Sequence, residues 1–209
     1  VPQVALTELV ANAWDAGATR VDLILPGEIG GTLTVTDNGH GMTPAQFKKR
    51  WMTLRYDRLK HQGANVEFPS GKSVHPRKAY GRNGVGRHGL LCFADEYEVQ
   101  TWREGSLATF VVGTESGPSP FVLRNEKLGQ KTGSGTRLAV NVARKLPDAD
   151  EILTVLAARF VHDPEFEIRV NGVQRSFTEI EGRVSEETLD LGTGRSAIVI
   201  VIDSTRLNH

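Results

Sequence analysis

The chain has 209 residues, of which 39% are hydrophobic and 24% charged, so it can bury one large core or two small ones. Its 25 basic and 25 acidic side chains cancel, which excludes a global positive field for nucleic acid and an acidic tail. A single cysteine, Cys92, excludes an internal disulfide and a thiolate zinc site, and no apolar run approaches the ~20 residues that span a bilayer. We therefore expect a cytoplasmic globular protein, and the helical pattern at the very start predicts a piece of a longer polypeptide.

Hydrophobic periodicity predicts both helices and strands along the chain. The first helix carries an apolar stripe that ends at Gly17, and a later helix begins with a capping box of Thr43 and Gln46 around Pro44. In chain order, the patterns predict a helix over 3–16, a hairpin of strands 21–25 and 32–36, a helix over 43–54, a loop over 55–80, a short helix over 90–94, antiparallel strands over 96–102, 107–112, 121–124 and 136–142, a helix from Asp148 or Asp150 to about Val161, a hairpin over 166–177, and a strand typical of a buried position over 197–202.

The charge is concentrated in one basic block. Residues 48–88 carry eleven basic and two acidic side chains. Such a block is either a solvated face or a surface that closes over a multiply charged anion. The block includes the spacing Gly81-x-x-Gly84-x-Gly86, whose backbone amides can cradle phosphate oxygens ahead of a helix. Taken alone, this glycine spacing is equally typical of tight turns.

Two further polar groups precede the basic block. Asp37 ends a predicted strand, so its carboxylate can accept a hydrogen bond from an exocyclic amine while Met42 offers an apolar wall to a flat ring. Glu8 and Asn12 lie one turn apart on the first helix, where an amide oxygen suits Mg²⁺ and a carboxylate can deprotonate a water. Taken singly, each group has a simpler interpretation. Asp37 and the glycines after it are also typical of a strand-to-helix turn, and Glu8 and Asn12 are also typical of solvated polar residues on a helix.

Taken together, the motifs resemble those of the GHKL ATPases, the group that contains DNA gyrase, the ninety-kilodalton heat-shock chaperone, MutL-type mismatch-repair proteins, MORC proteins and sensor histidine kinases. The residues that carry the resemblance are Glu8-x-x-x-Asn12-Ala13-x-Asp15-Ala16, Asp37-Asn38-Gly39-x-Gly41-Met42, Gly81-x-x-Gly84-Val85-Gly86 and Gly135-Thr136. The resemblance covers about residues 3–142, and the motif form is closest to the chaperone and MORC branch. It implies an α+β fold of the Bergerat type, a two-layer α/β sandwich whose mixed, mostly antiparallel sheet has helices on one face.

The resemblance also assigns roles to individual residues. It implies that Glu8 activates the attacking water, that Asn12 binds Mg²⁺, and that Asp37 recognises the adenine amino group. The full set of nucleotide-binding residues that it implies is Asn12, Asp15, Asp37, Gly41, Met42, Lys60, Gly81, Gly84, Val85, Gly86 and Thr136. Lys60 is a loose match, because Arg55 and Asp57 replace the usual small residues before it. Arg82, Arg87 and His88 are further candidates for contacts in the lid.

These roles imply an ATPase that binds ATP with Mg²⁺, hydrolyses it slowly to ADP and phosphate, and uses lid closure to drive dimerisation or rearrangement of a larger protein. One alternative is an ATP-sensing module without significant turnover. Another is a histidine-kinase catalytic domain, which Glu8 disfavours because sensor kinases usually carry Asn or His there. We expect residues 1–177 to form the ATP-binding domain and 178–209 to extend it or to begin a transducer domain. A nucleic-acid partner is implied by family analogy alone.

Overall fold

The computed structural model describes residues 1–53, 63, 65–69, 76–80, 86–116, 120–160, 163, 165–174 and 183–203. Its helical elements are α1 (Pro2–Asp15), α2 (Pro44–Gln46), η1 (Phe47–Trp51), η2 (Gly86–Cys92) and α4 (Ala149–Phe160). Its strands are β1 (Arg20–Ile24), β2 (Thr32–Asp37), β3 (Glu96–Arg103), β4 (Ser106–Thr114), β5 (Phe121–Gln130), β6 (Gly135–Asn141), β7 (Glu167–Val170), β8 (Arg183–Gly192) and β9 (Arg195–Ile202).

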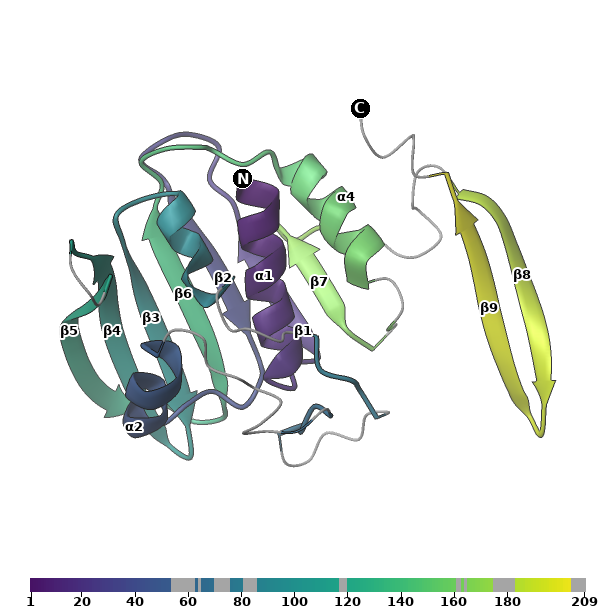
Figure 1. The fold of residues 1–209 in the computed structure, drawn as a ribbon, viewed down its shortest axis with the longest axis horizontal. Helices are drawn as coiled ribbons and strands as arrows, with labels where there is room; N and C mark the ends of the chain where they lie inside the picture. The colour runs from purple at the N-terminus through teal and green to yellow at the C-terminus, as the bar shows by residue number, and fades with distance from the viewer. Residues whose placement is uncertain are drawn as a thin grey trace.

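Seven strands form one sheet in the order β5-β4-β3-β6-β2-β1-β7. Only the pairing of β1 with β7 is parallel, and the other neighbours are antiparallel. The helices α1 and α4 and the short helix η2 lie on the same face of this sheet (Figure 1). The fold is therefore the predicted two-layer α+β sandwich of the Bergerat type.

The sheet is amphipathic because only one of its faces is covered by helices. Along β1 and β2, Val21, Leu23, Leu33 and Val35 are buried, whereas the intervening residues are partly or fully exposed. This alternation follows from the period of two along a strand. The uncovered face carries ion pairs between neighbouring side chains: Arg20 with Asp22, Arg137 with Glu98, and Arg169 with Glu167.

The ends of the helices agree with the capping residues in the sequence. Gly17 adopts φ +71° directly after α1, as expected for a residue that stops a helix. Thr43 and Gln46 form the predicted capping box at α2. At α4, the carboxylate of Asp148 accepts a hydrogen bond of 2.8 Å from the backbone N–H of Glu151.

Several predicted elements differ from the structure. The strand expected over 121–124 extends to Gln130, and the short helix expected over 90–94 lies over Gly86–Cys92. The helix expected over 43–54 is shorter, because η1 ends at Trp51 with a wide helical turn in place of a regular α-helix. The closing hairpin over 166–177 is reduced to β7, a tight turn and a single bridge between Val170 and Val173, while 175–177 lie outside the described residues. The sequence also missed the parallel pairing of β7 with β1, because the helix α4 that returns the chain to this edge leaves no pairing signal in β7 itself.

Strands β8 and β9 form a separate two-stranded sheet. They pair with each other and with none of the seven strands of the main sheet, and Figure 1 shows them beyond α4. The burial predicted for 197–202 is wrong, because Ile198 is 64% exposed and Val199 and Val201 are also exposed. Within the described part of the chain, no helix has the length and apolar character required to cross a membrane.

Candidate nucleotide-binding site

A cavity of about 1180 Å³ lies between α1, the turn after β2 and the start of η2. All of the predicted site residues that the structure describes line this cavity: Glu8, Asn12, Asp15, Asp37, Gly41, Met42, Gly86 and Thr136. Lys60, Gly81, Gly84 and Val85 were also predicted for the site and lie outside the described residues, as does Arg82. Residues from four distant regions of the sequence are thus brought to one concave surface.

Glu8 lies in the cavity wall at the point where α1 meets η2. Gly86 packs so closely on this side chain that a Cβ atom at position 86 would lie 2.4 Å from Glu8 Oε2 and 2.5 Å from Glu8 Cβ. Real Cβ atoms do not approach other heavy atoms to this distance, so glycine is required by space at this position. The end of the glycine motif therefore touches the predicted water-activating carboxylate directly.

Asn12 lies one turn after Glu8 and lines the same cavity. Its Nδ2 atom is buried and has no hydrogen-bond partner within the described residues. A buried donor without a partner is costly, and a phosphate oxygen in the cavity would satisfy it while the amide oxygen remained available to a cation. The described residues contain no cluster of three His, Cys, Asp or Glu side chains that could hold a metal. Mg²⁺ at Asn12 would therefore share phosphate oxygens and water, which is the coordination this ion prefers.

Asp37 is held in the cavity wall by strand pairing. In the register of β2 with β6, Asp37 lies opposite Thr136, which is 6% exposed and also lines the cavity. The carboxylate oxygen Oδ1 of Asp37 accepts a hydrogen bond of 2.8 Å from the backbone N–H of Gly39. This bond fixes the carboxylate in the turn.

The turn after Asp37 is pressed against two neighbouring strands. Gly41 has φ +62°, and a Cβ atom there would lie 2.1 Å from the carbonyl oxygen of Trp102. The backbone N–H of Met42 donates a 2.7 Å hydrogen bond to the hydroxyl of Thr101 on β3. Thr101 is fully buried and was not found by sequence reasoning, because a single threonine in a β-strand is ordinary in composition.

Asp15 has a structural partner as well as a place in the cavity wall. Its Oδ1 atom accepts a hydrogen bond of 2.7 Å from the backbone N–H of Tyr80. The carboxylate thus holds the chain just before the glycine motif. The contact of Asp15 with nucleotide, implied by the family resemblance, remains a prediction.

Arg87 and His88, the candidate lid residues, are both buried. Arg87 Nη1 donates to the backbone carbonyl of Arg50. The Trp51 Nε1–H donates to the Tyr97 hydroxyl at 2.8 Å, and this hydroxyl lies 2.8 Å from His88 Nδ1. These contacts join the start of η2 to the end of η1, so both side chains are engaged inside the protein beside the cavity.

The surroundings of His88 keep its imidazole neutral. Burial, and secondarily the positive charge of Arg87, lower the pKa of His88 to about 4 from its ordinary value of 6.5. Burial also raises the pKa of Tyr97, so its hydroxyl stays protonated and can donate to Nδ1. The ring of Phe121 stacks on the imidazole at a centroid distance of 3.7 Å.

The tryptophans and Cys92 differ in their burial. Trp14, Trp51 and Trp102 are all buried. Cys92 is only partly buried. It packs against the core and lines the cavity, because η2 places it at the rim.

The family of the chain is shown by comparison with known proteins. The profile of the family described as "Histidine kinase-, DNA gyrase B-, and HSP90-like ATPase" matches residues 1–116, and the chain belongs to this family. The cavity-lining residues Glu8, Asn12, Asp37 and Gly86 lie within the matched range. The matched range extends from α1 to β4 and ends before Thr136 on β6.

Similar curated proteins include bacterial MutL, the DNA mismatch repair protein. The MutL of Agrobacterium fabrum is 49% identical over 47 residues, which are 22% of this chain and 8% of that protein. A putative type II restriction enzyme, HgiDII of Herpetosiphon aurantiacus, is 29% identical over 105 residues, which are 50% of this chain and 15% of that enzyme. The chain therefore spans a small fraction of the length of these relatives.

Solved structures show the same fold. The ATPase region of Saccharomyces cerevisiae topoisomerase II matches with a TM-score of 0.55 and 19% identity, over 90% of this chain and 56% of that one. The same region bound to ICRF-187 (dexrazoxane) gives a TM-score of 0.53 and 20% identity, over 84% of this chain and 50% of that one. The chain spans about half the length of these structures.

The lowered pKa of His88 predicts acid sensitivity. Because the unfolded chain takes up a proton near pH 6.5 and the folded one only near pH 4, stability from neutral His88 is present above about pH 6.5 and is lost as the pH falls toward 4. The shift corresponds to roughly 3 kcal/mol of unfolding free energy. Urea unfolding between pH 7 and pH 4 should show a steeper loss for the native sequence than for His88→Asn. Parallel pH dependences for the two proteins would contradict this assignment.

Proposed function

We propose that this domain binds ATP with Mg²⁺ and hydrolyses it slowly to ADP and phosphate. The observation that carries the proposal is the convergence of the family's motif residues on one cavity, which is lined by Glu8 and Asn12 of α1 and by Asp37 and Thr136 of the sheet. A cavity that combines apolar walls with these carboxylate, amide and hydroxyl groups suits a ligand with a flat base and a polyphosphate.

Asp37 and Met42 form the base end of the proposed complex. The carboxylate of Asp37 accepts a hydrogen bond from the adenine amino group, and Met42 and Gly41 lie against the flat ring. Thr136 supports this recognition through a water. Guanine, which presents a carbonyl oxygen in place of the amine, would face the Asp37 carboxylate without a donor and is therefore disfavoured.

Glu8 acts at the phosphate end. Its carboxylate orients a water and accepts the proton that the water loses as its oxygen bonds to the γ-phosphorus and the bond to the ADP oxygen breaks. Asn12 would hold Mg²⁺, which neutralises charge on the phosphate oxygens. Gly81, Gly84, Val85 and Gly86 would surround the phosphates with backbone amides, and Lys60 would add a positive charge.

The ATP cycle is proposed to act on a larger protein. In this proposal a lid closes over MgATP and drives dimerisation or a rearrangement of other domains. The hairpin β8–β9 supports the assignment of 178–209 to a following domain, because it stays outside the main sheet and exposes apolar side chains on a strand rich in β-branched residues.

The similarity to MutL, the restriction enzyme and topoisomerase II supports a role of the whole protein in handling DNA. Assignment to the chaperone and MORC branch remains a prediction from the motif form.

Three substitutions separate binding from hydrolysis. Asp37→Asn should weaken ATP binding by about 100-fold, because it loses an acceptor for the adenine amine and presents a donor in its place. Glu8→Gln should keep ATP affinity within about twofold and lower hydrolysis at least about 100-fold, since the amide cannot accept the proton. Asn12→Ala should remove the dependence of ATP affinity on Mg²⁺. Calorimetric titration with ATP and a phosphate-release assay measure these effects.

Asp22→Asn and Glu98→Gln are matched controls on the uncovered face of the sheet, where both carboxylates form ion pairs, and both should behave like the native protein. Full affinity in Asp37→Asn would refute the base assignment. Unchanged hydrolysis in Glu8→Gln would refute the assigned role of Glu8 in activating water. ATP binding without measurable hydrolysis in the native chain would favour an ATP-sensing module.

Gly86→Ala tests the close approach of the glycine motif to α1. The added methyl group must displace the Glu8 side chain, because it would overlap both Oε2 and Cβ of that residue. We expect the rate of steady-state hydrolysis to fall at least about tenfold, because displacing a catalytic group lowers the rate of the chemical step more than it lowers nucleotide affinity. Gly27→Ala is the control for the loss of a glycine, because no atom lies within 4 Å of the added carbon and Gly27, like Gly86, lies outside the left-handed backbone region. Normal turnover in Gly86→Ala would show that Glu8 does not act from its present position.

A further inference from the structure

Two short stretches, residues 65–69 and 76–80, form a wall of the cavity that no family motif includes; we call them the base-side arm. They run antiparallel, with a bridge between Asn65 and Lys78 and a 2.8 Å hydrogen bond from the N–H of Val66 to the carbonyl of Arg77. The arm lines the cavity through Asn65, Glu67 and Tyr80. It is therefore part of the same concave surface as the motif residues.

The arm is attached to the base end of the cavity by its backbone. The His40 Nε2 atom, in the turn between Asp37 and Met42, lies 2.9 Å from the carbonyl oxygen of Glu67. Trp14 Nε1–H, near the end of α1, donates to the carbonyl of Lys78 at 2.9 Å. Because His40 belongs to the turn after Asp37 and lines the cavity together with Glu67, the arm adjoins the proposed adenine end of the cavity.

Arg77 holds the arm on the body of the domain from inside. Its side chain is only 2% exposed, and its Nε lies 2.9 Å from the carboxylate of Asp163, beyond the end of α4. Its Nη1 donates to the carbonyl of Ala18 at 2.5 Å, just after α1. One side chain thus joins the arm to two other parts of the domain.

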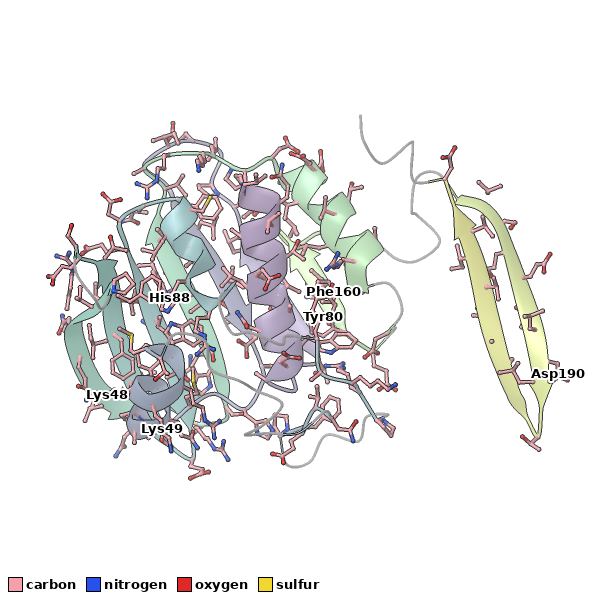
Figure 2. All side chains as sticks on the ribbon, viewed as in Figure 1. Lys48, Lys49, Tyr80, His88, Phe160 and Asp190 are labelled. Carbon is pink, nitrogen blue, oxygen red and sulfur yellow. The ribbon has the colours of Figure 1, made fainter. Side chains whose placement is uncertain are left out.

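Aromatic rings complete the environment of Arg77. The guanidinium carbon lies 4.1 Å from the ring centroid of Trp14, 4.9 Å from that of Phe68 and 5.1 Å from that of Phe166. Figure 2 shows Tyr80, the last residue of the arm, next to Phe160 of α4, and their ring centroids are 5.4 Å apart. A planar guanidinium can stack on aromatic faces and donate in its own plane at once, which the ammonium group of lysine cannot do.

We propose that Arg77 is a positioning residue of the nucleotide site, which fixes the base-side arm as the wall that covers the adenine end of the cavity. This inference rests on the proposed function. Arg77 acts through the arm and touches no reacting group, so its loss should weaken nucleotide binding and leave the chemical step intact. Removing one partner of a buried ion pair also leaves Asp163 without its cation, which detaches the arm from the domain.

Arg77→Met is the principal test, and Arg77→Lys asks whether charge alone suffices. We expect Arg77→Met to raise the Kd for ATP and ADP and the KM for ATP together, by about tenfold, with kcat changed less than twofold. Arg77→Lys should behave like Arg77→Met. Arg169→Met removes the same charge from the uncovered sheet face, where Arg169 pairs with Glu167, and should match the native chain. Calorimetry and steady-state kinetics provide these values.

A milder variant keeps the inference testable if Arg77→Met does not fold, which thermal unfolding without nucleotide will show. His40→Ala removes an exposed anchor of the arm, and it should raise KM severalfold at unchanged kcat. Native affinity in a folded Arg77→Met, or an unchanged KM in His40→Ala if the first variant is unfolded, would overturn the inference. A fall in kcat at unchanged Kd would also overturn it. Absence of ATP binding by the native chain would instead refute the proposed function.

Discussion

The antiparallel pairing of β2 with β6 is the constraint on which the candidate site depends. It places Asp37 opposite Thr136, two residues that are far apart in sequence, and β3 then brings Thr101 next to Thr136. Once these strands are in register, the turn after Asp37 has no freedom: Gly41 lies against the Trp102 carbonyl and Met42 is bonded to Thr101. A register slip of one residue would turn Asp37 to the other face of the sheet and remove it from the cavity.

The same sheet explains why the domain has one functional face. Helices cover only the side from which Leu23, Leu33 and Val35 project, and the cavity forms where α1 and η2 leave space above the strand ends. The opposite side carries paired charges and needs no cover. The β8–β9 hairpin differs from this pattern, because β9 exposes apolar residues on both of its faces. Asp190 lies near its tip, far from the main sheet (Figure 2).

Close packing around the cavity links the motifs to residues outside them. Gly86 packs against Glu8. Buried hydrogen bonds that run from Trp51 through Tyr97 to His88 join η1 to η2. Arg77 joins the base-side arm to the residues just after α1 and to the region after α4. Each of these supports acts through buried contacts. Leaving one buried donor or acceptor without its partner costs more free energy than the hydrogen bond itself contributes to stability. The geometry of the site therefore depends on residues that carry no motif.

The sequence by itself determined the local features: the capping box at Thr43, the glycine that follows α1 at Gly17, and most strands. These follow from short-range rules, since periodicity, caps and glycine requirements are set within a few residues. The motif residues that line the cavity were expected from the resemblance to the GHKL ATPases. Tertiary structure alone decided the parallel pairing of β7, the end of η1 at Trp51, the exposure of β9, and the buried roles of Arg77, His88 and Thr101. These depend on partners 9 to 147 residues away, as between His88 and Tyr97 or between Arg20 of β1 and Glu167 of β7, and the type of a residue does not specify its distant partner.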